Sequence, residues 1–349
     1  MAAVATMATT AGVAQAQTVA WLTTNFGSAS PVESYGGGTL ATLGTGRYEV
    51  TFPGAGNGIN SDVQISAVDY FSEGSPHYCT SAGWGSSNGT DVNVYVDCFD
   101  ATGAAVNGDF AAMYQARTTP PPGGWIAFLW ANQPTSPSYS PSSSYSYNSM
   151  GGTNIINRDT VGLYFAFLPG IHTNGGNPQV TAYGSTAAHC EVVDWYHNRA
   201  GVNVVVQCVN AAGQPADEYF DLSFAYGVSH GDSPATTPGG YAWANNAIAA
   251  GYKPPLVYQF NNISTDAIKG GNNGFGIGFL KLAVHNAQLF QPYLGLVTAM
   301  GSKGEFCDQS HIEQDTSKPQ NPSFFLVVQC YNAQGQFLND EYSGAIIAK

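Results

Sequence analysis

Short runs of alternating apolar and polar residues recur along the chain and predict β-strands throughout. They are clearest in the middle of the sequence, where the runs cover 125–132, 144–148, 162–170, 180–184 and 218–226. Gly, Pro, Asn and Ser separate the runs, and roughly eight runs per hundred residues is the spacing of an all-β sandwich or barrel. No helical period accompanies them, so the pattern predicts an all-β protein.

A six-residue cassette divides this pattern into three copies. It reads Cys98-Phe-Asp-Ala-Thr-Gly103, Cys208-Val-Asn-Ala-Ala-Gly213 and Cys330-Tyr-Asn-Ala-Gln-Gly335. Asp or Asn followed by a glycine is turn chemistry, because the Asx side chain bonds nearby backbone and glycine accepts a positive φ. A fixed long period marks an array of like units. The sequence therefore predicts three tandem copies of one β unit.

A second cysteine precedes each cassette, at a separation of 19, 18 or 23 positions. A polar turn lies between the two cysteines of each pair, so two antiparallel strands joined by that turn bring the cysteines together. The predicted disulfides are Cys79 with Cys98, Cys190 with Cys208, and Cys307 with Cys330.

Two Pro/Gly joints, at 118–124 and 236–240, stand just before the aromatic run that opens a copy. Proline stiffens an extended chain and glycine permits a turn, so these joints are the predicted boundaries. The predicted domains are 17–119, 124–235 and 240–349. Whether the copies pack around a threefold axis or lie as a string stays open.

Composition limits the partners. Charged residues make up 9% of the 349 residues, and 10 Lys and Arg face 23 Asp and Glu, a net charge of −13. Such a surface repels phosphate backbones, which argues against nucleic acid and anionic membranes as partners. No stretch approaches the roughly 20 apolar residues of a membrane span.

Residues 1–16 are small and apolar and end in Ala14-Gln15-Ala16, which is typical of the end of a signal peptide. No basic residue precedes them, so we expect the true start to lie upstream and maturation to follow Ala16. The predicted location is secreted and extracellular, where disulfides persist.

Catalytic and metal motifs are weak. The histidines do not stand at zinc-site spacings, and a serine elbow is incomplete at both Gly85-Ser86 and Gly184-Ser185. Acid pairs suited to glycoside hydrolysis are Glu191 with Asp194, Asp217 with Glu218, and Asp308 with Glu313. Asp217 and Glu218 are more simply interpreted as a solvated strand edge. We predict no catalytic residue, no cofactor and no metal.

Aromatic residues near the tips of the cysteine hairpins are the best candidates for binding. An exposed aromatic ring beside Asp, His or Asn can stack on a sugar ring and bond its hydroxyls. Aromatic caps on the end of a sandwich are the alternative. The predicted ligand-binding residues are Trp84, Asp194, Trp195, Tyr196 and His197.

The layout resembles uncharacterised secreted bacterial proteins built from tandem disulfide-bearing β-sandwich repeats. The resemblance rests on the aromatic-Ala-Asn, Tyr-x-Val-x-Phe-Pro-Gly, Val-Thr-Ala-Tyr-Gly and Cys-x-Asn-Ala-x-Gly stretches and covers the whole mature chain. It implies an extracellular all-β repeat protein and supplies no activity.

Together these features predict three antiparallel Ig-like or jelly-roll-like sandwiches with one hairpin disulfide each. The predicted function is that of a secreted, non-catalytic binding, adhesion or surface-structural protein. Its partner would be an extracellular glycan or cell-wall polymer, engaged through repeated modules that gain avidity; self-association stays open. The alternative is an extracellular glycosidase, esterase or peptidase with a site in the divergent third copy, near His285, Glu305, Asp308 and His311.

Overall fold

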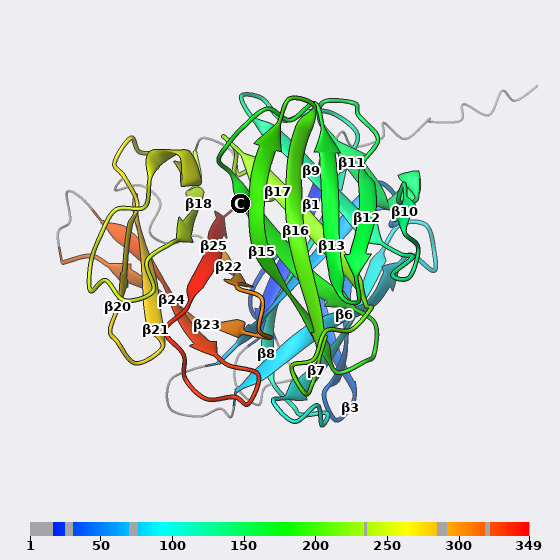
Figure 1. Ribbon diagram of the computed structural model, residues 1–349, viewed down its shortest axis with the longest axis horizontal. Coiled ribbons are helices and arrows are strands. Elements are labelled where there is room, and N and C mark those ends of the chain that lie inside the picture. The colour runs from blue at the N-terminus through cyan, green and yellow to red at the C-terminus, as the bar shows by residue number, and fades with distance from the viewer. Residues whose placement is uncertain are drawn as a thin grey trace, which may run out of the picture.

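The computed structural model describes residues 17–24, 31–69, 76–233, 236–284, 292–317 and 322–348. These residues form β-strands and two single-turn 3-10 helices, Ser143–Tyr145 and Leu256–Tyr258, with no α-helix among them (Figure 1). The all-β prediction is confirmed. The predicted signal-peptide segment 1–16 and His285 lie outside the described residues.

The first unit is a two-layer sandwich of eight strands. One layer has the order β2 (Pro31–Tyr35), β1 (Gln17–Thr24), β8 (Asp109–Arg117), β5 (Ser61–Val68). The other has the order β6 (His77–Gly85), β7 (Val92–Asp100), β4 (Arg47–Phe52), β3 (Thr39–Gly44). Alternate residues of both layers, such as Phe52, Val94 and Phe110, are buried between them in one apolar core.

The second and third units repeat this strand order. In the second unit, one layer has the order β11 (Ser146–Asn148), β9 (Trp125–Ala131), β17 (Tyr219–Tyr226), β14 (Asn177–Tyr183). The other layer has the order β15 (Ala188–Asn198), β16 (Gly201–Asn210), β13 (Leu163–Pro169), β12 (Ile155–Thr160), β10 (Ser138–Tyr139). In the third, the layers are β19 (Gln259–Asn261), β18 (Gly239–Ala244), β25 (Glu341–Ala348), β22 (Tyr293–Met300), and β23 (Phe306–Asp315), β24 (Ser323–Tyr331), β21 (Ile277–Ala283), β20 (Lys269–Asn272).

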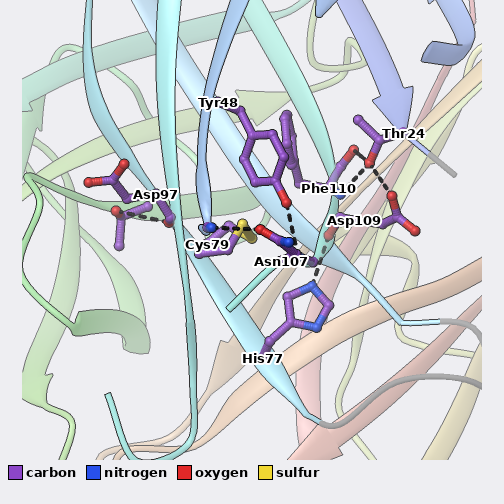
Figure 2. Close-up of a disulfide and its surroundings, with 12 residues drawn as sticks. Thr24, Tyr48, His77, Cys79, Asp97, Asn107, Asp109 and Phe110 are labelled. Atoms are coloured by element: carbon purple, nitrogen blue, oxygen red, sulfur yellow. Dashed lines mark hydrogen bonds between the residues drawn. A yellow bond between two sulfur atoms is a disulfide. The ribbon is translucent and has the colours of Figure 1, made fainter. Parts of the chain in front are cut away.

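All three predicted disulfides are present. Each joins cysteines that face each other directly across the two strands of a hairpin, with Cα atoms 4.0 to 4.1 Å apart. Figure 2 shows the first of them, with Asn107 beside it accepting a hydrogen bond from the backbone N–H of Gly46 at 2.8 Å. The same hydrogen bond, from a glycine backbone N–H to an Asp or Asn side chain, recurs between Gly162 and Asp217 and between Gly276 and Asn339.

These hydrogen bonds give Asp217 a structural role at the strand edge where the sequence places it. Its carboxylate accepts from Gly162 and forms two bonds of 2.8 Å with the Arg158 guanidinium, and its side chain is only 19% exposed. Its place after the cassette turn is needed to fix the neighbouring hairpin.

The three units close into a ring through parallel pairing of their edge strands. β14 pairs with β6 at Tyr183 and Ser81, β22 pairs with β15 at Met300 and Val192, and β5 pairs with β23 at Val68 and Gln309. Each of the three large sheets therefore combines one layer from each of two units. The packing question is settled in favour of a pseudo-threefold ring.

A relay of hydroxyl groups reinforces the ring near its axis. The hydroxyl of Thr181 accepts from the backbone N–H of Ile65 at 2.9 Å, and that of Thr298 accepts from Val180 at 3.0 Å. The hydroxyl of Ser66 closes the cycle by accepting from Val297 at 2.8 Å. Each unit thus satisfies a backbone donor of its neighbour, so the three contacts depend on all three units being present.

Three rings also meet at the axis, each contributed by the residue just before the first cysteine of a pair. Tyr78, His189 and Phe306 have ring centroids 4.8 to 5.5 Å apart. They lie beside a small internal cavity of about 50 Å³ that is lined by equivalent residues of the three units.

The cassettes touch one another around the same axis. A β-carbon added to Gly103 would lie 2.6 Å from that of Ala211; for Gly213 and Ala333 the distance is 2.7 Å, and for Gly335 and Ala101 it is 2.8 Å. The cassette is therefore both a turn and a contact between units, which explains why its Ala and Gly recur.

Replacing Gly213 by Ala is expected to lower the free energy of unfolding by about 3 kcal/mol. Part of the loss is the strain of a non-glycine residue at φ 71°, and the rest is overpacking against Ala333. The matched control is Gly54→Ala, at φ 68° with open space around it, which should cost about 1 kcal/mol. Denaturant unfolding of both variants measures the difference, and equal losses would refute the unit contact.

Candidate functional site

The two tryptophans of the predicted ligand site are not the exposed rings that the prediction assumes: Trp195 is buried and Trp84 is half-buried. Trp195 is only 5% exposed and packs on Trp243 and Tyr258 of the third unit, with ring centroids 5.0 and 5.5 Å away. Trp84 is half-buried and meets Trp130 and Tyr145 of the second unit in the same manner. Both tryptophans therefore fill junctions between units.

A bulge in each hairpin accompanies this arrangement. The register of β6 shifts between Ser81 and Gly83, that of β15 between Val192 and Asp194, and in each hairpin the tryptophan follows just after the shift. In the third unit the corresponding position, after the shift between Gln309 and His311, is held by Ile312. Among the described residues, the third junction thus has Ile312 where the other two hairpins have a tryptophan.

Three of the predicted ligand residues remain accessible on the second unit. Tyr196 is 43% exposed, and Asp194 is exposed with its carboxylate bonded to the backbone N–H of Trp195 at 2.8 Å. His197 is half-buried, and its Nε2 lies 3.0 Å from Nδ1 of His172. This histidine pair could not be predicted from the sequence, because the two residues stand 25 positions apart and meet only in the folded second unit.

The acidic residues proposed for the hydrolase alternative lie at different junctions. Glu305, only 7% exposed, lies with buried Glu191 between the second and third units. Asp308 is buried where the third unit meets the first, beside Asp69. His311 is half-buried and lies next to Ser310. These residues do not converge on one cavity.

Glu191 and Glu305 form a buried pair of carboxyl groups. Glu191 accepts a hydrogen bond from the backbone N–H of Gly304 at 2.8 Å, and Glu305 accepts one from Lys303 at 2.7 Å. Burial, with a further contribution from the hydrogen bond to Glu305, raises the pKa of Glu191 to about 10. Glu191 is therefore protonated at neutral pH and can donate to Glu305.

Asp308 and Asp69 are arranged in a related way. Burial raises the pKa of both groups, and the charge of Asp69 raises that of Asp308 further. The Tyr331 hydroxyl donates to Asp69 at 3.0 Å, and Gln329 donates to the Asp69 backbone carbonyl at 2.7 Å. Each of these two junctions thus contains a buried acid whose pKa is raised.

A serine, a histidine and an asparagine lie in contact inside the ring. The Ser223 hydroxyl is 3.1 Å from Nδ1 of His230, whose Nε2 is 2.9 Å from the Asn177 side-chain oxygen. The order resembles the Ser-His-Asp triad of nucleophilic hydrolases, with an amide in place of the carboxylate, but here all three residues are at most 1% exposed. Burial lowers the pKa of His230 to about 4. Without access for a substrate, the trio connects strands of the second unit.

The trio belongs to a wider buried network that includes Asp62. The Gln115 side chain donates both to Asp62, at 3.0 Å, and to Ser223, at 3.0 Å. Burial is the main cause that raises the pKa of Asp62 to about 7. Hydrogen bonding of this kind satisfies polar groups that the closed ring removes from water.

Within the described ranges, no three or more His, Cys, Asp or Glu side chains are grouped so that they could hold a metal ion. No helix in the same part of the chain is long and apolar enough to cross a membrane. Comparison with protein families, with curated proteins and with solved structures finds no match to this chain.

Acidification from pH 8 to pH 5 is expected to raise the free energy of unfolding. Folded Glu191 keeps a proton that the unfolded chain, with a pKa of 4.5, releases, so the group destabilises the fold by about 1.4 kcal/mol per pH unit above that value. Buried histidines act oppositely below pH 6.5. The acids with strongly raised pKa outnumber the histidines with lowered pKa: Asp62, Glu191, Asp221, Asp308 and Asp340 against His189, His230 and His311.

Denaturant unfolding at constant ionic strength, at pH 5 and pH 8, measures this trend. Glu191→Gln keeps the shape and removes the titration, so its stability should depend less steeply on pH, by about one proton. If the free energy of unfolding had the same slope against pH in the parent and in Glu191→Gln, the assignment of a protonated Glu191 would be contradicted. The general effect of a lower net charge at pH 5 is the same in both proteins and cannot produce a difference between their slopes.

Replacing Trp195 by Ala is expected to lower the free energy of unfolding by about 3–5 kcal/mol, because it opens a cavity at the junction with Trp243. Tyr196→Ala, one residue away on an exposed position, should change it by no more than about 0.5 kcal/mol. Denaturant unfolding of the two variants compares them. Similar small effects would show that Trp195 does not support the junction.

Proposed function

We propose that this protein is a secreted, non-catalytic surface-structural or binding protein that acts as a rigid three-unit block. The observation that carries the proposal is the use made of the repeated and chemically reactive residues. The cassettes, the hairpin tryptophans and the buried acids all lie at contacts that close the ring. Residues that are buried in contacts between units cannot reach a substrate.

An extracellular location is part of the proposal. Three disulfides and no free cysteine suit an oxidising compartment. The signal-like segment 1–16 and the resemblance to secreted bacterial repeat proteins support the same location. We further propose that each unit is jelly-roll-like, since the four strands in each layer of the first and third units, and the four and five strands of the second, agree better with the eight strands of a jelly roll than with the seven of an Ig constant domain.

A glycan or cell-wall polymer remains the proposed partner, but not through the tryptophans. Tyr196 and Asp194 offer an exposed ring beside a carboxylate on the second unit, whereas the equivalent positions are Gly85 and Gly83 in the first unit and Glu313 and His311 in the third. Avidity from three equal sites therefore loses its support, and any polymer would be held by one unit or by several chains.

The test combines a binding panel with an activity screen. The purified chain is incubated with insoluble cell-wall and polysaccharide materials, and with broad esterase, glycosidase and peptidase substrates. We expect the chain to be retained on at least one material and to turn over none of the substrates. We also expect the chain to resist proteases at pH 5. Turnover that copurifies with the chain and disappears in Ser223→Ala or Glu191→Gln would refute the non-catalytic assignment.

A further inference from the structure

A cavity of about 280 Å³ lies on the outer side of the third unit, where β20, β21 and the start of β24 meet the preceding loop. Figure 1 shows β20 and β21 at the edge of the molecule, away from the other two units. The lining residues are Lys253, Asp266, Ala267, Lys269, Lys281, Ala283 and Ser323. Three of the six lysines of this acidic chain thus face one cavity.

Two of these lysines stand directly opposite each other on paired strands. Lys269 of β20 is the register partner of Lys281 of β21, and both side chains line the cavity. Like charges at directly opposed positions of an antiparallel pair destabilise it. An anion between them would remove the repulsion.

The cationic charge is only partly neutralised by the protein. The Lys281 amino group is 3.0 Å from Asp315 and lies 4.5 Å from the ring centroid of Phe325. Within the described ranges no ion pair joins Lys253 or Lys269 to a carboxylate. Asp266 also lines the cavity, so the three lysines face the carboxylates of Asp266 and Asp315 and leave a local excess of one positive charge. Because solvent ions screen charges beyond about 8 Å, the more distant acids of the chain weaken this excess little.

Ser323 supplies a hydroxyl that lacks a partner. Its side chain is 1% exposed, lines the cavity, and has no hydrogen-bond partner in the described structure. A buried polar group left unsatisfied costs free energy, so its hydroxyl is suited to donate to an oxygen atom of a ligand.

The framework of the units does not require these lysines. The pair opposed as Lys269 and Lys281 corresponds to Thr39 and Thr51 in the first unit and to Ile155 and Phe167 in the second. Those pairs form the same strand contact without charge. The lysine pair is therefore specific to the third unit.

We propose that this cavity binds an oxyanion: a carboxylate, sulfate or phosphate group on a small ligand of about the size of one sugar ring. Lys253 and Lys269 provide the charge, Lys281 is held in place by Asp315, and Ser323 donates its hydroxyl. The volume of about 280 Å³ lies just below the roughly 300–1,000 Å³ of most small-molecule sites, which suits a small ligand. This site does not depend on the structural role proposed above.

Isothermal titration calorimetry at low salt, with inorganic sulfate, inorganic phosphate, D-glucuronate and neutral glucose as separate probes, tests the site. We expect one saturable site for at least one of the three anions, and none for glucose. Lys269→Gln should raise the Kd of that anion about tenfold, because a charged hydrogen bond is lost. Which anion binds best identifies the source of the oxyanion.

Two controls separate the site from general effects. Arg199→Gln removes the same charge from an exposed turn of the second unit and should leave the Kd unchanged. Without ligand, Lys269→Gln should unfold at an equal or higher denaturant concentration than the parent, because a like-charge pair is gone. Equal weakening by Arg199→Gln, equal binding of glucose, or no saturable binding of any anion would overturn the proposal.

Discussion

Parallel pairing at the edges of three sandwiches is the constraint on which the rest of this structure depends. Each unit presents an unpaired edge strand on each of its layers, and such edges tend to aggregate unless they are covered. Here β14 meets β6, β22 meets β15, and β5 meets β23, each through one paired position. Three copies suffice to close the cycle, so the repeat number and the architecture share one cause.

Ring closure also dictates where polar chemistry can be found. Hydroxyls of Ser66, Thr181 and Thr298 serve the backbone of the next unit, and this layer is equivalent in all three junctions. The carboxyl groups are not equivalent: Glu191 meets Glu305 at one junction, whereas Asp308 meets Asp69 at another. The junctions therefore share a backbone frame but differ in their buried acids.

Symmetry separates framework from function in this molecule. Features that recur explain folding; examples are the cassettes and the hydrogen bonds from a glycine N–H to an Asp or Asn side chain. Features confined to one unit are candidates for function: the His172 and His197 pair on the second unit and the lysine cavity on the third. A concentration of lysines between 253 and 281 in a lysine-poor chain was the signal in the sequence that could have led to the cavity.

The sequence by itself determined what depends on neighbours along the chain: the strands, the turn in each cassette, the hairpin disulfides and the existence of three copies. The alternation of apolar and polar residues along each strand also indicated which side chains face away from solvent. It could not tell what covers them, because Trp195 is buried by Trp243 and Tyr258 of another unit. Only the tertiary structure decided the ring, the burial of the predicted binding aromatics and the convergence of Lys253 with Lys269 and Lys281. Those outcomes rest on contacts between distant segments, for which local spacing carries no information.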